Sequence, residues 1–118
     1  MKPLENINYI YIRKKRKTTG TCQQLEAPLQ FTSRTPSSPL IQAIWIDDCL
    51  STGTSLRDGV KLLLHDYNIK IVGAFFCVDR SVDRANIPEE EQPLLDPILQ
   101  DVKIVALCDL KDVDLRIK

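Results

Sequence analysis

Residues 44–57 read Ile44-Trp-Ile-Asp-Asp-Cys-Leu-Ser-Thr-Gly-Thr-Ser-Leu-Arg57, and this stretch is the centre of the chain. It begins within the apolar run Ala43–Ile46, which is too short for a helix and is bounded by polar residues, so it predicts a buried strand. Asp47 and Asp48 come at the predicted end of that strand. A loop of small and hydroxylated residues follows, and after it a helical pattern places one apolar face on Leu56, Val60, Leu63 and Leu64.

A strand, a small-residue loop and a helix in this order are able to bind an anion. Loop amides and the helix N-terminus together present N–H donors and a partial positive charge. Gly53 allows a close backbone approach or a positive φ, and hydroxyl donors are available from Ser51, Thr52, Thr54 and Ser55. The loop lacks the Gly-Lys-Ser/Thr of a nucleoside triphosphatase phosphate loop and the three glycines of the dinucleotide-binding fingerprint. The pattern therefore disfavours both of these nucleotide-binding classes.

The two aspartates narrow the choice of ligand. Carboxylates repel phosphate, so beside a phosphate loop they are expected to face sugar hydroxyls or a hard cation such as Mg²⁺. One phosphate with hydroxyls beside it describes a ribose 5-phosphate. Two other interpretations of Asp47 and Asp48 stay open from spacing alone: an ordinary strand end followed by a turn, or the acidic pair of a receiver domain that holds Mg²⁺.

The stretch from Ala43 to Arg57 closely resembles the phosphoribosyl-diphosphate (PRPP) binding motif of type I phosphoribosyltransferases. Tyr11–Gly20 resembles the Arg-Lys-x-x-Lys-x-His-Gly segment of the orotate phosphoribosyltransferases, and Val72–Arg80 resembles their strand ending in Asp-Arg. Val102–Asp112 resembles their last strand and its Leu-Lys-Asp turn. The resemblance runs through most of this chain but covers only the C-terminal part of that family's usual length.

The resemblance implies an α/β fold: a Rossmann-like parallel sheet flanked by helices, as in type I phosphoribosyltransferases, truncated at its N-terminus. It implies one domain over residues 1–118, in which residues 17–39 form a long flexible loop that closes over the active site. Two departures concern this loop. Thr19 stands where the family has a histidine, and Pro36-Ser-Ser-Pro39 makes the loop longer than usual. The chain is then a fragment, a truncated reading frame, or one component of a split enzyme.

The activity implied is transfer of 5-phosphoribosyl from PRPP to orotate with release of pyrophosphate, in pyrimidine nucleotide (UMP) biosynthesis. Lys17, Asp47 and Asp48 take the catalytic positions, and Ser51 and Arg80 contact orotate, with Arg84 as a neighbouring candidate for the same contact. Mg²⁺ arrives with PRPP or pyrophosphate, no metal site belongs to the protein itself, and a homodimer shares the active site. The PRPP-binding positions are Arg13, Lys14, Lys17, Asp47, Asp48, Cys49, Leu50, Ser51, Thr52, Gly53, Thr54 and Ser55.

Three alternatives remain beside this hypothesis. One is a non-catalytic PRPP-binding module for regulation or assembly, and another is a phosphoribosyltransferase for a different base. The third is an RNA-associated regulator that uses the basic run Arg13–Lys17. Lysine plus arginine and aspartate plus glutamate both number 16, and this balance argues against a nucleic-acid partner.

Composition sets the remaining bounds. At 118 residues the chain forms one domain with a modest core. No apolar run approaches the ~20 residues of a membrane span and no signal-peptide core is present, so a cytoplasmic location is expected. Four widely spaced cysteines without a Cys-x-x-Cys pattern predict reduced, buried thiols at Cys22, Cys49, Cys77 and Cys108.

The remaining patterns predict the other elements. Strands are expected over Ile7–Ile12, Ile69–Val78 and Lys103–Leu107, the second covered on both faces of a parallel sheet. Helices are expected over about 55–67, with Thr54 or Ser55 as N-cap, and over 88–100, broken at Pro93 and Pro97. A short helix or turn is expected over 110–117. His65, the single histidine, has no metal-ligand companions and is expected at the surface or at a helix end.

Overall fold

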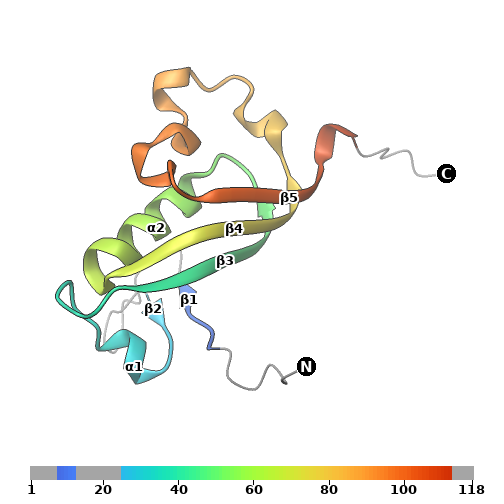
Figure 1. Cartoon of the computed structure of the whole chain (residues 1–118). Helices are drawn as coiled ribbons and strands as arrows, with labels where there is room; N and C mark the ends of the chain where they lie inside the picture. The colour runs from blue at the N-terminus through green and yellow to red at the C-terminus, as the bar shows by residue number, and fades with distance from the viewer. Residues whose placement is uncertain (1–7, 13–24, 113–118) are drawn as a thin grey trace, which may run out of the picture.

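The computed structural model describes residues 8–12 and 25–112 (Figure 1). They form an α/β unit whose main sheet has three parallel strands in the order β3-β4-β5. A separate two-stranded antiparallel sheet pairs β1 with β2. The elements are β1 (Tyr11–Ile12), β2 (Leu25–Glu26), α1 (Leu29–Thr32), β3 (Ile41–Leu50), α2 (Thr54–Tyr67), β4 (Ile69–Asp79), the 3₁₀ turns η2 (Ser81–Arg84), η3 (Glu89–Glu91), η4 (Pro93–Leu95) and η5 (Pro97–Leu99), β5 (Lys103–Asp109) and η6 (Leu110–Asp112).

The core lies between the sheet and α2. The helix turns Leu56, Gly59, Val60 and Leu63 inward, at the spacing expected of an apolar helix face. β4 supplies the opposite surface through Ile69, Ile71, Ala74 and Phe76, all buried. β4 is the central strand of the sheet, and its inward side chains pack against α2.

Both crossover connections lie on the same side of the sheet. A right-handed crossover that always steps to the next strand in the same direction places every connection on one face. The structure agrees with this rule, since η4 and η5, from the second connection, pack against α2 from the first. The described residues therefore leave the other face bare, with Ile44, Ile46, Phe75 and Leu107 exposed by 58%, 78%, 46% and 83%.

The predicted coverage of β4 on both faces is therefore wrong for the described part of the chain. A nearly continuous apolar strand indicates a parallel sheet, but the pattern does not record which way the chain steps at each crossover. The expectation of buried thiols is wrong for the same reason, because Cys77 and Cys108 are exposed while Cys49 is half-buried. Cys22 lies outside the described residues.

Two residues, Asn68 and Arg34, donate to the carbonyl groups at the C-terminal end of α2. Asn68 adopts the left-handed conformation (φ 53°, ψ 44°) that asparagine tolerates best after glycine, and its N–H donates to the Leu64 carbonyl at 3.2 Å. Arg34 donates from Nε to the Tyr67 carbonyl at 2.8 Å and also binds the Pro39 carbonyl. A cation at this end of the helix opposes the partial negative charge of the last carbonyls. His65 is exposed in the same turn, as expected.

Several predicted boundaries are corrected. The strand predicted to end at Ile46 continues to Leu50, so the two aspartates lie within β3. Part of the predicted loop is ordered as β2 and α1, and β1 joins β2 instead of the main sheet. Residues 88–100 form three 3₁₀ turns and no helix, because proline at the start of η4 and of η5 interrupts any α-helical hydrogen bonding. No helix in the described residues is long and apolar enough to cross a membrane.

Candidate active site

The loop between β3 and α2 lies at the edge of the sheet where parallel strands end, the edge that binds ligands in open α/β sheets (Figure 1). Gly53 is the N-cap of α2 and has φ +94° and ψ −1°, a backbone conformation that residues other than glycine rarely adopt. No side chain caps the helix, so the prediction of Thr54 or Ser55 as N-cap is wrong. Gly53 is also buried against Leu94 of η4, which leaves no room for a Cβ atom.

Backbone donors of this loop are available to a ligand. Arg57 N donates to the Gly53 carbonyl at 2.9 Å and begins the α-helical pattern. Within the described residues, no protein acceptor receives the amides of Ser51, Thr52, Gly53, Ser55 and Leu56. Unpaired amides at a helix N-terminus carry the partial positive charge that attracts phosphate. The loop therefore has the donors that a single phosphate requires.

Hydroxyl groups add donors at the same place. Thr52 Oγ1 lies 3.1 Å from Thr54 Oγ1 and 3.4 Å from the amide of Thr54. Ser55 is exposed on the first turn of α2. Cys49 is half-buried, and the Leu50 side chain is buried in the core while its carbonyl accepts from Arg80 N at 2.7 Å. Of the predicted PRPP-binding positions, Leu50 therefore anchors the loop, and Thr52, Thr54 and Ser55 place hydroxyl groups beside it.

Asp47 and Asp48 are both exposed on β3 just before the loop. Asp48 N donates to Asp47 Oδ1 at 2.8 Å, which holds the first carboxylate against the backbone of the next residue. Consecutive strand residues point to opposite faces, so the two carboxylates diverge and do not converge on one ligand atom. No cluster of three or more metal-ligating side chains occurs among the described residues. The pair suits hydroxyl groups, or a Mg²⁺ ion that keeps its own water and phosphate ligands.

A network of four charged side chains follows β4 and reaches back to the loop. Arg84 pairs with Asp79 at 2.7 Å and donates to the Ser51 carbonyl at 2.6 Å. Arg80 pairs with Asp83 at 2.9 Å, and Ser51 Oγ donates to Asp83 Oδ2 at 2.6 Å. The Asp79–Arg84 contact is short but does not have the geometry of a hydrogen bond. The network fastens the phosphate loop to the end of β4.

This network changes the interpretation of the predicted orotate residues. Ser51 and Arg80 are brought together, as predicted, but both bind Asp83. Arg84, the neighbouring candidate, is only 15% exposed and is committed to Asp79 and the loop carbonyl. Asp79 and Arg80 do not pair with each other. The hydrogen bond from Ser51, and then the nearby Arg80, hold the pKa of Asp83 below its usual value.

Sequence reasoning missed Asp83 and a second serine–aspartate contact at the end of β5. Ser81 Oγ donates to both carboxylate oxygens of Asp109, at 2.8 and 2.7 Å, and Lys111 N donates to Oδ1 at 3.1 Å. These hydrogen bonds lower the pKa of Asp109, the serine first. An aspartate at the carboxyl end of a strand was the available signal. The contact ties β5 to η2 and so to the loop.

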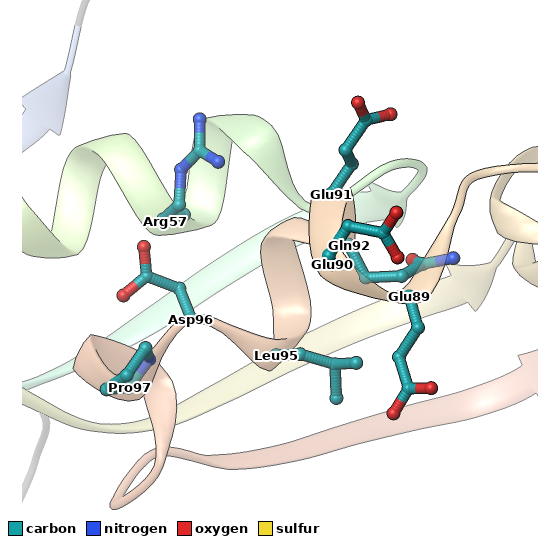
Figure 2. A pocket seen from close by; sticks show the side chains of 8 residues that line it. All are labelled: Arg57, Glu89, Glu90, Glu91, Gln92, Leu95, Asp96 and Pro97. Atoms are coloured by element: carbon teal, nitrogen blue, oxygen red, sulfur yellow. The ribbon is translucent and has the colours of Figure 1, made fainter.

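A shallow open hollow of about 430 Å³ adjoins α2 on the side of the 3₁₀ turns (Figure 2). Arg57 of α2 lies beside Asp96, and Lys61 forms an ion pair with Asp96 at 2.8 Å. Most of the hollow's charge is negative, so it is unsuited to an anion and does not extend the group of amide donors in the β3–α2 loop. It is lined by Arg57, Glu89, Glu90, Glu91, Gln92, Leu95, Asp96 and Pro97. The acidic run Glu89–Glu91 is exposed and forms the 3₁₀ turn η3.

The cationic part of the predicted site, Arg13, Lys14 and Lys17, lies outside the described residues, as do Thr18, Thr19 and the rest of the segment up to residue 24. The described site therefore contains the loop, the two acids and the network behind them.

No family model and no curated protein sequence matches the chain. Its structure is similar to those of phosphoribosyltransferases. An orotate phosphoribosyltransferase from Aeropyrum pernix matches with 22% identity and a TM-score of 0.42 over 64% of this chain and 39% of that one. An adenine phosphoribosyl transferase from Trypanosoma brucei, in complex with AMP, pyrophosphate and ribose-5-phosphate, matches with 16% identity and a TM-score of 0.49 over 97% of this chain and 49% of that one.

The chain thus spans less than half the length of both proteins. Because both TM-scores are below 0.5, we base the proposed function on the residues of the site rather than on these likenesses.

Proposed function

We propose that this chain carries the PRPP site of a type I phosphoribosyltransferase of the orotate kind. The observation that carries the proposal is the β3–α2 loop, which has unpaired amides with hydroxyl groups beside them around a glycine at φ +94°, shortly after two exposed carboxylates. A lone phosphate fits the loop, and hydroxyls of an attached sugar fit the acids. This ligand needs no donors for a second phosphate among the described residues.

The reaction would be attack by a pyrimidine nitrogen on C1 of PRPP, with pyrophosphate leaving. Residues 51–55 would hold the 5-phosphate, and Asp47 and Asp48 would bind ribose hydroxyls and stabilise positive charge that develops on the sugar. Mg²⁺ carried by PRPP would neutralise the leaving group, a task in which Arg13, Lys14 and Lys17 are expected to share. A homodimer with a shared site and a cytoplasmic location belong to the same proposal.

Calorimetry with PRPP in the presence of Mg²⁺ tests the site directly. We expect binding to the parent protein, competition by ribose 5-phosphate, and weaker binding to Asp47→Asn and to Asp48→Asn. Asp101→Asn is the matched control, because it removes the same charge at an exposed position beyond η5. If the parent does not bind PRPP, or if the two site variants bind it as the control does, the proposal is wrong.

A second candidate is a PRPP-binding module without transferase activity. It is favoured by the contact of Asp83 with both predicted base-binding side chains, because orotate would have to replace Asp83 at Ser51 and Arg80. An assay for orotidine monophosphate separates the two candidates. PRPP binding with product formation supports the enzyme, and PRPP binding without product supports the module.

A further inference from the structure

Asp83 lies where two donors from different parts of the chain converge. Ser51 Oγ, from the phosphate loop, donates to its Oδ2 at 2.6 Å, and Arg80 Nε, from the end of β4, lies 2.9 Å from the same oxygen. The donors are 32 and 3 residues away in sequence. A hydroxyl and a guanidinium that meet at one carboxylate oxygen form a carboxylate-binding site, which the chain fills with its own aspartate.

Arg80 and Asp83 are exposed enough to exchange one partner for another. Arg80 and Asp83 have side chains exposed by 47% and 26%, whereas Arg84 is 15% exposed and holds both Asp79 and the Ser51 carbonyl. Of the two guanidinium groups after β4, Arg80 is therefore the one able to turn to a ligand. Asp83 belongs to η2, a four-residue 3₁₀ turn in which no residue is buried, so moving its side chain disrupts no core contact.

We propose that Asp83 is a specificity-determining residue that occupies the carboxylate subsite of the base site and must be displaced by an acidic base. This inference rests on the proposed function, because it takes Ser51 and Arg80 as base-binding donors. It follows that the side chain selects against bases that carry a carboxylate and leaves neutral bases unaffected. An acidic base binds by exchanging one carboxylate for another, so its net gain is small.

The charge of Asp83 persists under the conditions in which a base would bind. Its pKa is held below the usual value, chiefly by the hydrogen bond from Ser51 and also by Arg80, so the carboxylate is ionised at neutral pH. Asp79, Arg84 and Arg80 are the charged groups that face it or its two donors.

The experiment measures the affinity of orotate and of uracil for the parent, Asp83→Asn and Asp83→Ala by calorimetry without PRPP. Uracil has the same ring without the carboxylate, so it separates carboxylate competition from a general change in the fold. We expect orotate to bind both variants about threefold to fivefold more tightly, the range of an exposed ion pair. Uracil should bind all three proteins equally or none of them, and Asp101→Asn should bind orotate as the parent does.

Equal or weaker orotate binding to both Asp83 variants overturns the inference, because Asp83 then only holds Ser51 and Arg80 in place. Parallel tightening of uracil, or failure of every protein to bind orotate at millimolar concentration, overturns it as well. PRPP binding is measured separately on the same proteins. Its absence defeats the proposed phosphoribosyltransferase site, whereas its presence with unchanged orotate affinity defeats only the role of Asp83.

Discussion

Gly53→Ala tests whether the loop conformation that exposes the amides depends on glycine. The backbone at φ +94° disfavours any Cβ, and strain of this kind costs about 1–3 kcal/mol. The new methyl would also lie 2.5 Å from Leu94 Cδ2 and 2.7 Å from Leu94 Cγ. Leu94 is half-buried and its end can rotate, so overpacking falls at the low end of its usual range of about 1–3 kcal/mol.

We therefore expect Gly53→Ala to lower the free energy of unfolding by about 2–4 kcal/mol, a large part of what a small domain has. Urea denaturation followed by the fluorescence of Trp45, the single tryptophan, measures this change. PRPP binding under native conditions should weaken at the same time, since relief of the strain turns the loop amides away from their present direction.

Two comparison variants separate the causes. Leu94→Ala removes the steric clash but not the backbone strain, so the double variant should recover about 1 kcal/mol relative to the sum of the single changes. Gly73→Ala places its methyl 3.6 Å or more from the nearest atoms without a positive φ, and should change stability by less than about 0.5 kcal/mol. If Gly53→Ala behaves like Gly73→Ala and binds PRPP normally, the loop does not depend on its glycine.

Three further changes address the contacts around the loop. Arg84→Gln removes the ion pair with Asp79 and the bond to the Ser51 carbonyl; we expect a loss of about 1–2 kcal/mol in urea denaturation and weaker PRPP binding. Gly59→Ala places a methyl 2.5 Å from the indole of Trp45, so overpacking should exceed the gain in helix propensity by about 1 kcal/mol and shift the tryptophan emission. The bond from Lys61 lowers the pKa of Asp96. A depressed folded pKa adds stability above the unfolded pKa, and that stability disappears as the pH falls through the folded value. Asp96→Asn should therefore lose less stability than the parent below about pH 4, measured by circular dichroism during acid titration.

The sequence predicted an element correctly where its residue pattern fitted only one type of secondary structure. The run Ile69–Val78 is apolar at nearly every position, and β4 occupies it with one further residue. The loop-to-helix pattern after Leu50 placed α2 within one residue, because the apolar spacing and the end at Tyr67–Asn68 agree with each other. The start of α2 also placed the loop between β3 and α2, whereas Asp47 and Asp48 lie within β3 and not at its end.

The sequence could not predict contacts that depend on how distant parts of the chain are brought together. The partners of Arg80 and Arg84 follow from the 3₁₀ turn η2, which brings Asp83 to Arg80 and Arg84 back to Asp79. Asp83 gave no signal, since its contact with Ser51 spans 32 positions. The 3₁₀ turns replaced the predicted second helix because prolines override the apolar spacing.

The bare face of the sheet and the candidate site have one topological origin. Because both crossovers lie on one side, α2 is covered by η4 and η5, and Leu94 reaches the N-terminus of the helix where it packs on Gly53. The same arrangement brings η2 back over the loop, so that Arg84 fastens the Ser51 carbonyl. A connection that crossed to the other face would cover Ile46 but would remove the contact that holds the loop. The side of the sheet that builds the site is therefore the side that leaves the opposite face exposed.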